Sequence, residues 1–316
     1  MAAIVDIVTV AENENGTQSR AVPASVRLWR DRIDTRLGQL IRADEQACPT
    51  LVEAMRYSLM SRGKRVRPLL AVLTALDFGR DPQRLLDFGC ALELVHCASL
   101  MLDDLPCMDN ARMRRGKPAA HIQFGEATTT LAAIALLNQA YGVIANSDAL
   151  AESIRCRLVA QLSEAVGTAG LVSGQSRDLV ERKRGVDSAG LRRINQQKTG
   201  VLFELAVVGG GTIADLPEAR LKILNEFAGH VGQAFQSADD LLDCQQHCGT
   251  TGKDSGVDVE KAGSVHQLGE DTLRERLIGE LDAADAQLDA LGIDDSLLKN
   301  FVLSLFRRLL QGSRPQ

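Results

Sequence analysis

The sequence contains few aromatic residues, no alternating apolar run of useful length and no linker rich in Pro or Ser. Aromatic residues make up 3% of the 316 positions, whereas hydrophobic residues make up 45%, so a core must be filled mainly by Leu, Ala and Val. The absence of alternation argues against half-buried strands. Because composition does not change abruptly along the chain, one domain is favoured over two.

Features of a secreted, membrane-spanning or polyanion-binding protein are also missing. The formal net charge is -5, and no basic segment is interleaved with aromatic residues, so no nucleic acid is expected as a partner. Residues 1–22 begin with an apolar patch that lacks a basic leader, which predicts a flexible tail and no integral membrane segment. The seven cysteines are odd in number and scattered, which suits a cytoplasmic protein. The domain is expected over residues 23–316.

What the sequence does contain is helical periodicity. From Val26 onward, apolar residues recur mainly at intervals of three and four, which predicts about a dozen helices. Breaks are expected at Pro68, at Gly116-Lys117-Pro118 and near Gly209-Gly210-Gly211. The charged, glycine-rich stretch 249–263 is expected to form a mobile loop at the mouth of a site. The predicted fold class is all-α, a single-domain helical bundle.

Two acidic clusters lie far apart in the sequence, each in an apolar stretch typical of a buried helix. The first holds Asp103, Asp104 and Asp109, and the second holds Asp239, Asp240 and Asp243. Buried carboxylates are costly unless a cation compensates their charge. Mg2+ prefers oxygen ligands and is commonly held by a few carboxylates together with the phosphates of a substrate. The pattern therefore predicts a Mg2+-diphosphate site at which the two clusters face each other.

Basic residues gather in two further segments. Residues 62–67 carry four cations before Pro68, which favours either an anion site at a helix start or a solvated basic turn. Residues 112–117 carry four more directly after the first acidic cluster, where they could neutralise the carboxylates or bind a diphosphate. The residues alone leave both pairs of alternatives open.

Glu93 and His96 form a Glu-x-x-His pair on an apolar helix, which raises the possibility of a di-iron carboxylate bundle. That architecture needs a second such pair. None of the other histidines has a Glu three residues before it, so the di-iron hypothesis is disfavoured.

Taken together, the motifs resemble those of the trans-isoprenyl diphosphate synthases. The matching segments are residues 63–68, the Asp-Asp-x4-Asp cluster followed by residues 114–118, and residues 198–200, 235–243 and 252–254. They occur in the order and spacing of that family over roughly residues 25–310. The resemblance implies a helical bundle of isoprenoid synthase type with a central active-site cavity, usually a homodimer. It also implies Mg2+ as cofactor, with isopentenyl diphosphate and the allylic dimethylallyl, geranyl and farnesyl diphosphates as substrates.

The resemblance further implies a role for each matching position. The six aspartates match the metal-site residues. The allylic diphosphate would be held by Arg114, Lys198 and Lys253, and isopentenyl diphosphate by Lys64, Arg67, His96 and Arg115. Gln236 and the Lys198-Thr199 segment match catalytic groups that present oxygens toward the developing allylic cation.

The length of the prenyl product is a finer question. It is expected to depend on the residues four and five positions before Asp103. On a helix these positions, Ser99 and Ala98, lie about one turn deeper along the path of the growing chain. Both are small, and the absence of an aromatic floor at Ala98 resembles geranylgeranyl diphosphate synthases. A farnesyl diphosphate synthase is the alternative.

Two alternatives from other classes were weighed. A class I terpene cyclase should carry a different second acidic motif and no basic segment for a second diphosphate. A non-catalytic regulatory subunit of a heteromeric synthase should have lost charged ligands. None is lost here, although Gly263 stands where the family often has Thr, and Asn110 and Ala111 shorten the first acidic run.

Overall fold

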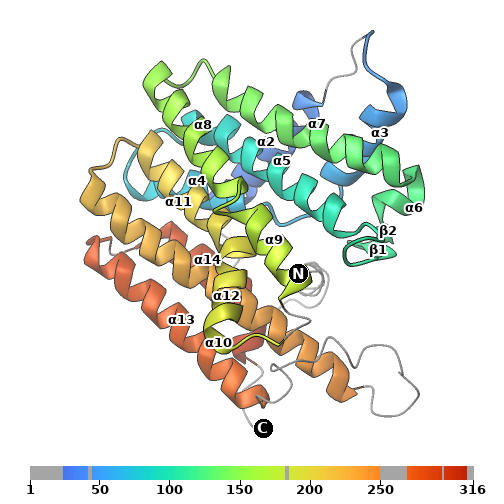
Figure 1. Cartoon of the computed structure of the whole chain (residues 1–316). Coiled ribbons are helices and arrows are strands. Elements are labelled where there is room, and N and C mark those ends of the chain that lie inside the picture. The colour runs from blue at the N-terminus through green and yellow to red at the C-terminus, as the bar shows by residue number, and fades with distance from the viewer. Residues whose placement is uncertain (1–23, 42–44, 182–184, 250–268, 294, 312–316) are drawn as a thin grey trace.

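Figure 1 shows the computed structural model, which describes residues 24–41, 45–181, 185–249, 269–293 and 295–311. The tail predicted over residues 1–22 and the loop predicted over 249–263, apart from its first residue, lie outside the described residues. The side chains of residues 243–249 are also outside the description.

The described chain is almost entirely helical, which confirms the predicted all-α class. The elements are α2 (Ala24–Leu40), α3 (Pro49–Leu59), α4 (Val66–Asp77), the 3-10 helix η2 (Pro82–Leu85), α5 (Leu86–Asp103), α6 (Ala120–Phe124), α7 (Glu126–Ala145), α8 (Glu152–Val166), α9 (Leu171–Val180), α10 (Ser188–Asn195), the π-helix η4 (Gln196–Gly200), α11 (Val201–Ile213), α12 (Glu218–Gly249), α13 (Glu270–Ala290) and α14 (Leu297–Gln311). One short antiparallel hairpin, β1 (Met113–Arg114) with β2 (Lys117–Pro118), interrupts them.

Helix α5 lies in the interior of the bundle. It packs against α4, α7 and α2, and its residues from Phe88 to Ala98 are buried without a break. A helix that is apolar all round must be buried on all sides, and α5 meets that condition. Figure 1 shows α3, α6 and the hairpin gathered at its C-terminal end, where the first acidic cluster begins.

Helix α11 corrects one prediction. Gly209, Gly210 and Gly211 were expected to break the chain, but α11 runs through them to Ile213. A Cβ added at Gly209 would lie 2.2 Å from Phe88 Cζ, and one at Gly210 would lie 2.9 Å from the carbonyl oxygen of Ala71. These glycines therefore let α11 approach α5 and α4 closely, and that gain in packing outweighs the low helix propensity of Gly.

Two helical stretches are long and apolar enough to cross a membrane by length and composition alone, Pro82–Asp103 and Glu126–Ala145. In the first, 72% of the apolar window is buried inside the protein, as in the core helix of a bundle. In the second, only 39% of the window is buried. Leu131 and Ile134 of this second stretch, which is α7, are exposed.

Candidate active site

A cationic cleft, called here the basic cleft, opens between the start of α4, the middle of α5, the hairpin and α12. Its lining residues are Lys64, Arg65, Val66, Arg67, Glu93, His96, Arg115, Phe203, Phe235 and Asp239. The four residues that the resemblance assigns to isopentenyl diphosphate, from three separate segments, thus lie in one cleft. Their proposed roles remain predictions, but the structure brings all four together.

The cations of the basic cleft are poorly compensated. Within the described residues, Lys64 Nζ and Arg67 Nε are buried and have no hydrogen-bond partner. Burial lowers the pKa of Lys64 to about 8, although the charge of Asp239 acts in the opposite direction. Burial also lowers the pKa of Arg67 to about 10, with Glu93 raising it and Arg115 lowering it further. Such a surplus of buried donors favours an anionic ligand.

His96 and Arg115 form the far wall of this cleft. Arg115 Nη2 donates to His96 Nε2 at 3.4 Å. Burial, followed by the charges of Arg67 and Arg115, holds the pKa of His96 well below its usual range. His96 is therefore neutral near pH 7, and its ring adds a hydrogen-bonding group without adding charge.

Aromatic rings close the apolar side of the cleft. The guanidinium carbon of Arg67 lies 4.7 Å from the centroid of Phe203, a cation–π contact that fixes the side chain in the absence of a hydrogen bond at Nε. Phe203 in turn contacts Phe235 at 4.7 Å between centroids, and Phe235 contacts Phe306 of α14 at 4.9 Å. These rings limit the access of water to the cleft.

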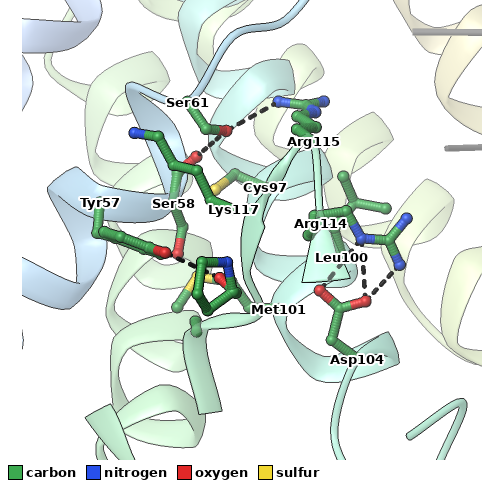
Figure 2. Close-up of a pocket in the computed structure, with 12 residues that line it drawn as sticks. Tyr57, Ser58, Ser61, Cys97, Leu100, Met101, Asp104, Arg114, Arg115 and Lys117 are labelled. Carbon is green, nitrogen blue, oxygen red and sulfur yellow. Dashed lines mark hydrogen bonds and ion pairs between the residues drawn. The ribbon is translucent and has the colours of Figure 1, made fainter. Parts of the chain in front are cut away.

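In contrast to the basic cleft, the first acidic cluster is compensated within the protein, because basic side chains pair with its carboxylates. Figure 2 shows Arg114 pointing at Asp104, with its Nε donating to the two carboxylate oxygens at 3.0 and 3.1 Å and its Nη2 donating to Oδ1. Its neighbour Arg115 points toward Ser61, 3.4 Å away. Adjacent arginines of one hairpin thus contact two different parts of the site: Arg114 bonds the first acidic cluster, and Arg115 lines the basic cleft.

Asp103, also of the first cluster, lies against the predicted residue Lys198 and against Gln175, which the sequence analysis did not identify. It accepts from the side-chain amide of Gln175 and lies 3.5 Å from Lys198 Nζ. Lys198 also donates to Asp178 at 2.7 Å. Burial raises the pKa of Asp103, an effect that Lys198 offsets and the charge of Asp109 reinforces. Gln175 and Asp178 are therefore additional residues of the site.

The sequence does contain a pattern that could have identified Gln175 and Asp178. Gln175 and Asp178 are three apart on α9, so both lie on one helix face, and Gly174 precedes them. A Cβ at Gly174 would lie 2.3 Å from the backbone nitrogen of Lys198. The glycine lets α9 approach the π-helix η4, a type of bulge that is frequent at functional sites. Thr199, the other predicted residue of η4, is buried.

The second acidic cluster is described only in part. Asp239 is buried and faces the basic cleft, while Asp240 accepts from the side-chain amide of Gln236 at 2.8 Å. The side chain of Asp243 and all of Lys253 lie outside the described residues. Among the side chains that are described, no three His, Cys, Asp or Glu groups converge as they would around a metal ion.

The two positions predicted to set chain length lie on α5. Ala98 is 2% exposed. Ser99 is half-buried, and its hydroxyl donates to the carbonyl oxygen of His96 at 2.9 Å. Helix α5 therefore carries the small residues, the cleft residue His96 and the first aspartate on consecutive turns.

Glu93 is not part of a di-iron pair. Its carboxylate accepts from Arg65 Nη1 at 2.8 Å, and both side chains are 3% exposed. Because the carboxylate is already compensated by Arg65, the di-iron hypothesis is disfavoured further.

Comparison with known proteins identifies the family to which this chain belongs. The polyprenyl synthetase family matches residues 48–264. A geranylgeranyl diphosphate synthase of Pantoea ananas is 39% identical over 293 residues, which is 90% of this chain and 96% of that protein. One of Pseudescherichia vulneris is 44% identical over 269 residues, 83% of this chain and 85% of that protein. Among solved structures, an FPP/GFPP synthase of Zymomonas mobilis superposes with a TM-score of 0.79 at 30% identity, covering 92% of this chain and 98% of the other.

The fold is thus that of the isoprenyl diphosphate synthases, and the chain belongs to the polyprenyl synthetase family. The predicted family and the predicted class of enzyme, a prenyltransferase, are confirmed.

Proposed function

We propose that this protein condenses isopentenyl diphosphate with allylic diphosphates in the presence of Mg2+ and releases geranylgeranyl diphosphate as its main product. The observation that carries the proposal is the basic cleft. Four side chains from three segments converge there, and within the described part of the chain Lys64 Nζ and Arg67 Nε are buried without a hydrogen-bond partner. A diphosphate is the ligand class that such paired, uncompensated donors suit best.

Each half of the site has its own task. Lys64, Arg67 and Arg115 hold the diphosphate of the isopentenyl substrate, and neutral His96 adds a hydrogen bond. Arg114 and Lys198 hold the allylic diphosphate, whose negative charge grows as the bond between carbon and oxygen breaks. The allylic carbon then bonds to the isopentenyl double bond, and the proton lost in the elimination passes to the released diphosphate. Phe203 and Phe235 limit water around the carbocation.

Mg2+ supplies further stabilisation of the leaving diphosphate when it is bound. The aspartates offer the hard oxygen ligands that Mg2+ prefers, and burial together with the charge of Asp109 raises the pKa of Asp103, which indicates a carboxylate in need of more positive charge. The fit requires a change of partners, because Arg114 bonds Asp104 and Gln175 bonds Asp103.

The product assignment rests on the small residues of α5 and on the relatives. Ala98 and Ser99 are small, so no ring at these positions is expected to stop the growing chain, and the relatives from Pantoea and Pseudescherichia are named geranylgeranyl diphosphate synthases. Farnesyl diphosphate is the second candidate, since the neighbour from Zymomonas is titled an FPP/GFPP synthase. A regulatory subunit is disfavoured because the cations of the basic cleft are retained.

A homodimer in the cytoplasm is part of the same proposal. Ile122 of α6 and Leu131 and Ile134 of α7 are 51%, 58% and 55% exposed. A second copy covering this face would bury apolar area that is otherwise in contact with water. The five cysteines whose side chains are described are all free, as expected in a reducing compartment.

The test is a product assay. Purified protein is incubated with isopentenyl diphosphate, Mg2+ and each allylic primer in turn, and the chain length of the product is measured. Geranylgeranyl diphosphate is expected from all three primers. Farnesyl diphosphate as the end product would contradict the product assignment, and no condensation with any primer would contradict the proposed function.

A further inference from the structure

Arg65 lines the basic cleft, but its guanidinium is bonded to groups of the protein. Its backbone has a φ of 51°, in the left-handed region, immediately before α4. Left-handed conformations are unfavourable for residues other than Gly and persist where the surrounding structure enforces them. Here the side chain of Arg65 is bonded to Asp34 and Glu93, whereas Nζ of its neighbour Lys64 has no hydrogen-bond partner among the described residues.

One guanidinium joins helices α2, α3 and α5 and the loop between α3 and α4. Arg65 Nε donates to Asp34 Oδ1 of α2 at 2.7 Å, and Nη1 donates to Glu93 Oε1 of α5 at 2.8 Å. Nη2 donates to the carbonyl oxygen of Leu59, the last residue of α3, at 2.9 Å and to that of Ser61 at 3.4 Å. The loop that carries Lys64 is thereby tied to the helix that carries His96.

The contact with Glu93 also has an electrostatic consequence. Glu93 lies in the basic cleft and interacts with Arg67 and Arg115 through its charge, raising the pKa of each against the lowering by burial. A carboxylate so placed competes with a diphosphate for the same two cations. Because Arg65 bonds Glu93, the negative charge of this carboxylate is compensated by Arg65, and Arg67 and Arg115 stay available.

We infer that Arg65 is a positioning residue of the isopentenyl diphosphate site, which fixes the loop of Lys64 and keeps Glu93 from pairing with Arg67 and Arg115. This inference rests on the proposed function. Because Nε, Nη1 and Nη2 of Arg65 are each bonded to a protein group, its effect is expected to pass through Lys64, Arg67 and Arg115 and to fall on one substrate of the two.

The experiment compares Arg65→Met, Glu93→Gln and the double variant by steady-state kinetics with each substrate varied in turn. Arg65→Met is expected to raise KM for isopentenyl diphosphate by more than about tenfold, with a smaller change for the allylic substrate. In the double variant the freed carboxylate is gone, and KM is expected to return to within about threefold of the wild-type value. Arg62→Met is the matched control, since Arg62 is an exposed residue of the same segment.

Folding is checked by circular dichroism and thermal unfolding. If Arg65→Met does not fold, Arg65→Lys takes its place, because lysine keeps the charge opposite Glu93 but cannot make all the hydrogen bonds. Calorimetric titration with isopentenyl diphosphate gives a second readout that does not depend on turnover.

The outcomes separate the two proposals. Equal changes for both substrates in Arg65→Met, without recovery in the double variant, would mean that Arg65 only stabilises the fold and would overturn this inference. A wild-type protein that binds isopentenyl diphosphate but does not condense it would contradict the proposed function, while calorimetry of the variants would still decide the role of Arg65. A wild-type protein that does not bind it overturns both.

Discussion

The basic cleft and the first acidic cluster differ in how their charges are compensated. In the cleft, the guanidinium of Arg67 lies over the ring of Phe203, and Lys64 Nζ and Arg67 Nε have no hydrogen-bond partner in the described structure. In the acidic cluster, Asp104 and Asp103 are bonded by Arg114, Lys198 and Gln175. The cleft is thus prepared for an anion before one arrives, whereas the aspartates must exchange partners before they can bind a metal ion.

The largest effect is expected in the acidic cluster. Asp103→Asn removes a candidate Mg2+ ligand and should lower kcat by at least about a hundredfold. The free energy of unfolding should change little, because the lost ion pair with Lys198 is offset by the removal of a buried charge. Turnover at saturating Mg2+ and thermal unfolding are measured together, with exposed Asp148→Asn as control. Near wild-type turnover would contradict the metal-site hypothesis.

A smaller effect is expected from substitutions of the arginines, which should change KM for one substrate in the basic cleft and for the other substrate at the acidic cluster. Arg67→Ala removes a charge-assisted contact worth about 1.5 to 3 kcal/mol and should raise KM for isopentenyl diphosphate by about ten- to a hundredfold. Arg114→Ala should act mainly on the allylic substrate. Both are measured by varying one substrate at saturation of the other. If the two variants changed the same KM, the division of the cations between two diphosphates would be wrong.

A change beneath the acidic cluster should alter the product more than the rate. Ala98→Tyr adds a ring at a position that is 2% exposed, and overpacking of an apolar tunnel costs about 1 to 3 kcal/mol. The first condensation should proceed, and farnesyl diphosphate should accumulate in place of the longer product. Chain-length analysis of the products checks this, and an unchanged distribution in an active variant would show that the chain grows elsewhere.

The smallest expected effect is the pH dependence of the basic cleft. Because burial lowers the pKa of Lys64 to about 8, the ammonium loses its proton as pH rises through 8. We therefore expect kcat/KM for isopentenyl diphosphate to fall by about three- to tenfold there. Lys64→Arg should remove the decline, and a wild-type profile that is flat from pH 7 to 9 would contradict the expected role of Lys64.

The same pKa fixes the sign of a stability effect. The folded protein releases the Lys64 proton at a lower pH than the unfolded chain does, so between about pH 8 and the ordinary lysine pKa the unfolded state binds more protons. The contribution of Lys64 to the free energy of unfolding therefore rises with pH in this window. Below it, the buried charged lysine destabilises the fold.

Local patterns in the sequence predicted the helices, and the structure brings together the four residues that the family resemblance had grouped. The four residues of the basic cleft belong to contiguous motifs, so their types and spacing could be read directly. Gly209 to Gly211 were misjudged because their use depends on Phe88 and Ala71, which lie on other helices. The same holds for Arg65, whose partner Asp34 is 31 residues away. Contacts of this kind depend on tertiary packing and leave no local pattern.

The comparison between the two regions can be tested most directly by equilibrium binding with and without divalent metal. Calorimetric titrations in EDTA and in Mg2+ would compare isopentenyl diphosphate with geranyl diphosphate. We predict that isopentenyl diphosphate binds in EDTA with an affinity within about threefold of that in Mg2+, and that geranyl diphosphate loses at least about tenfold. An equal loss for both ligands would mean that the basic cleft is not prepared without metal, and would contradict this account.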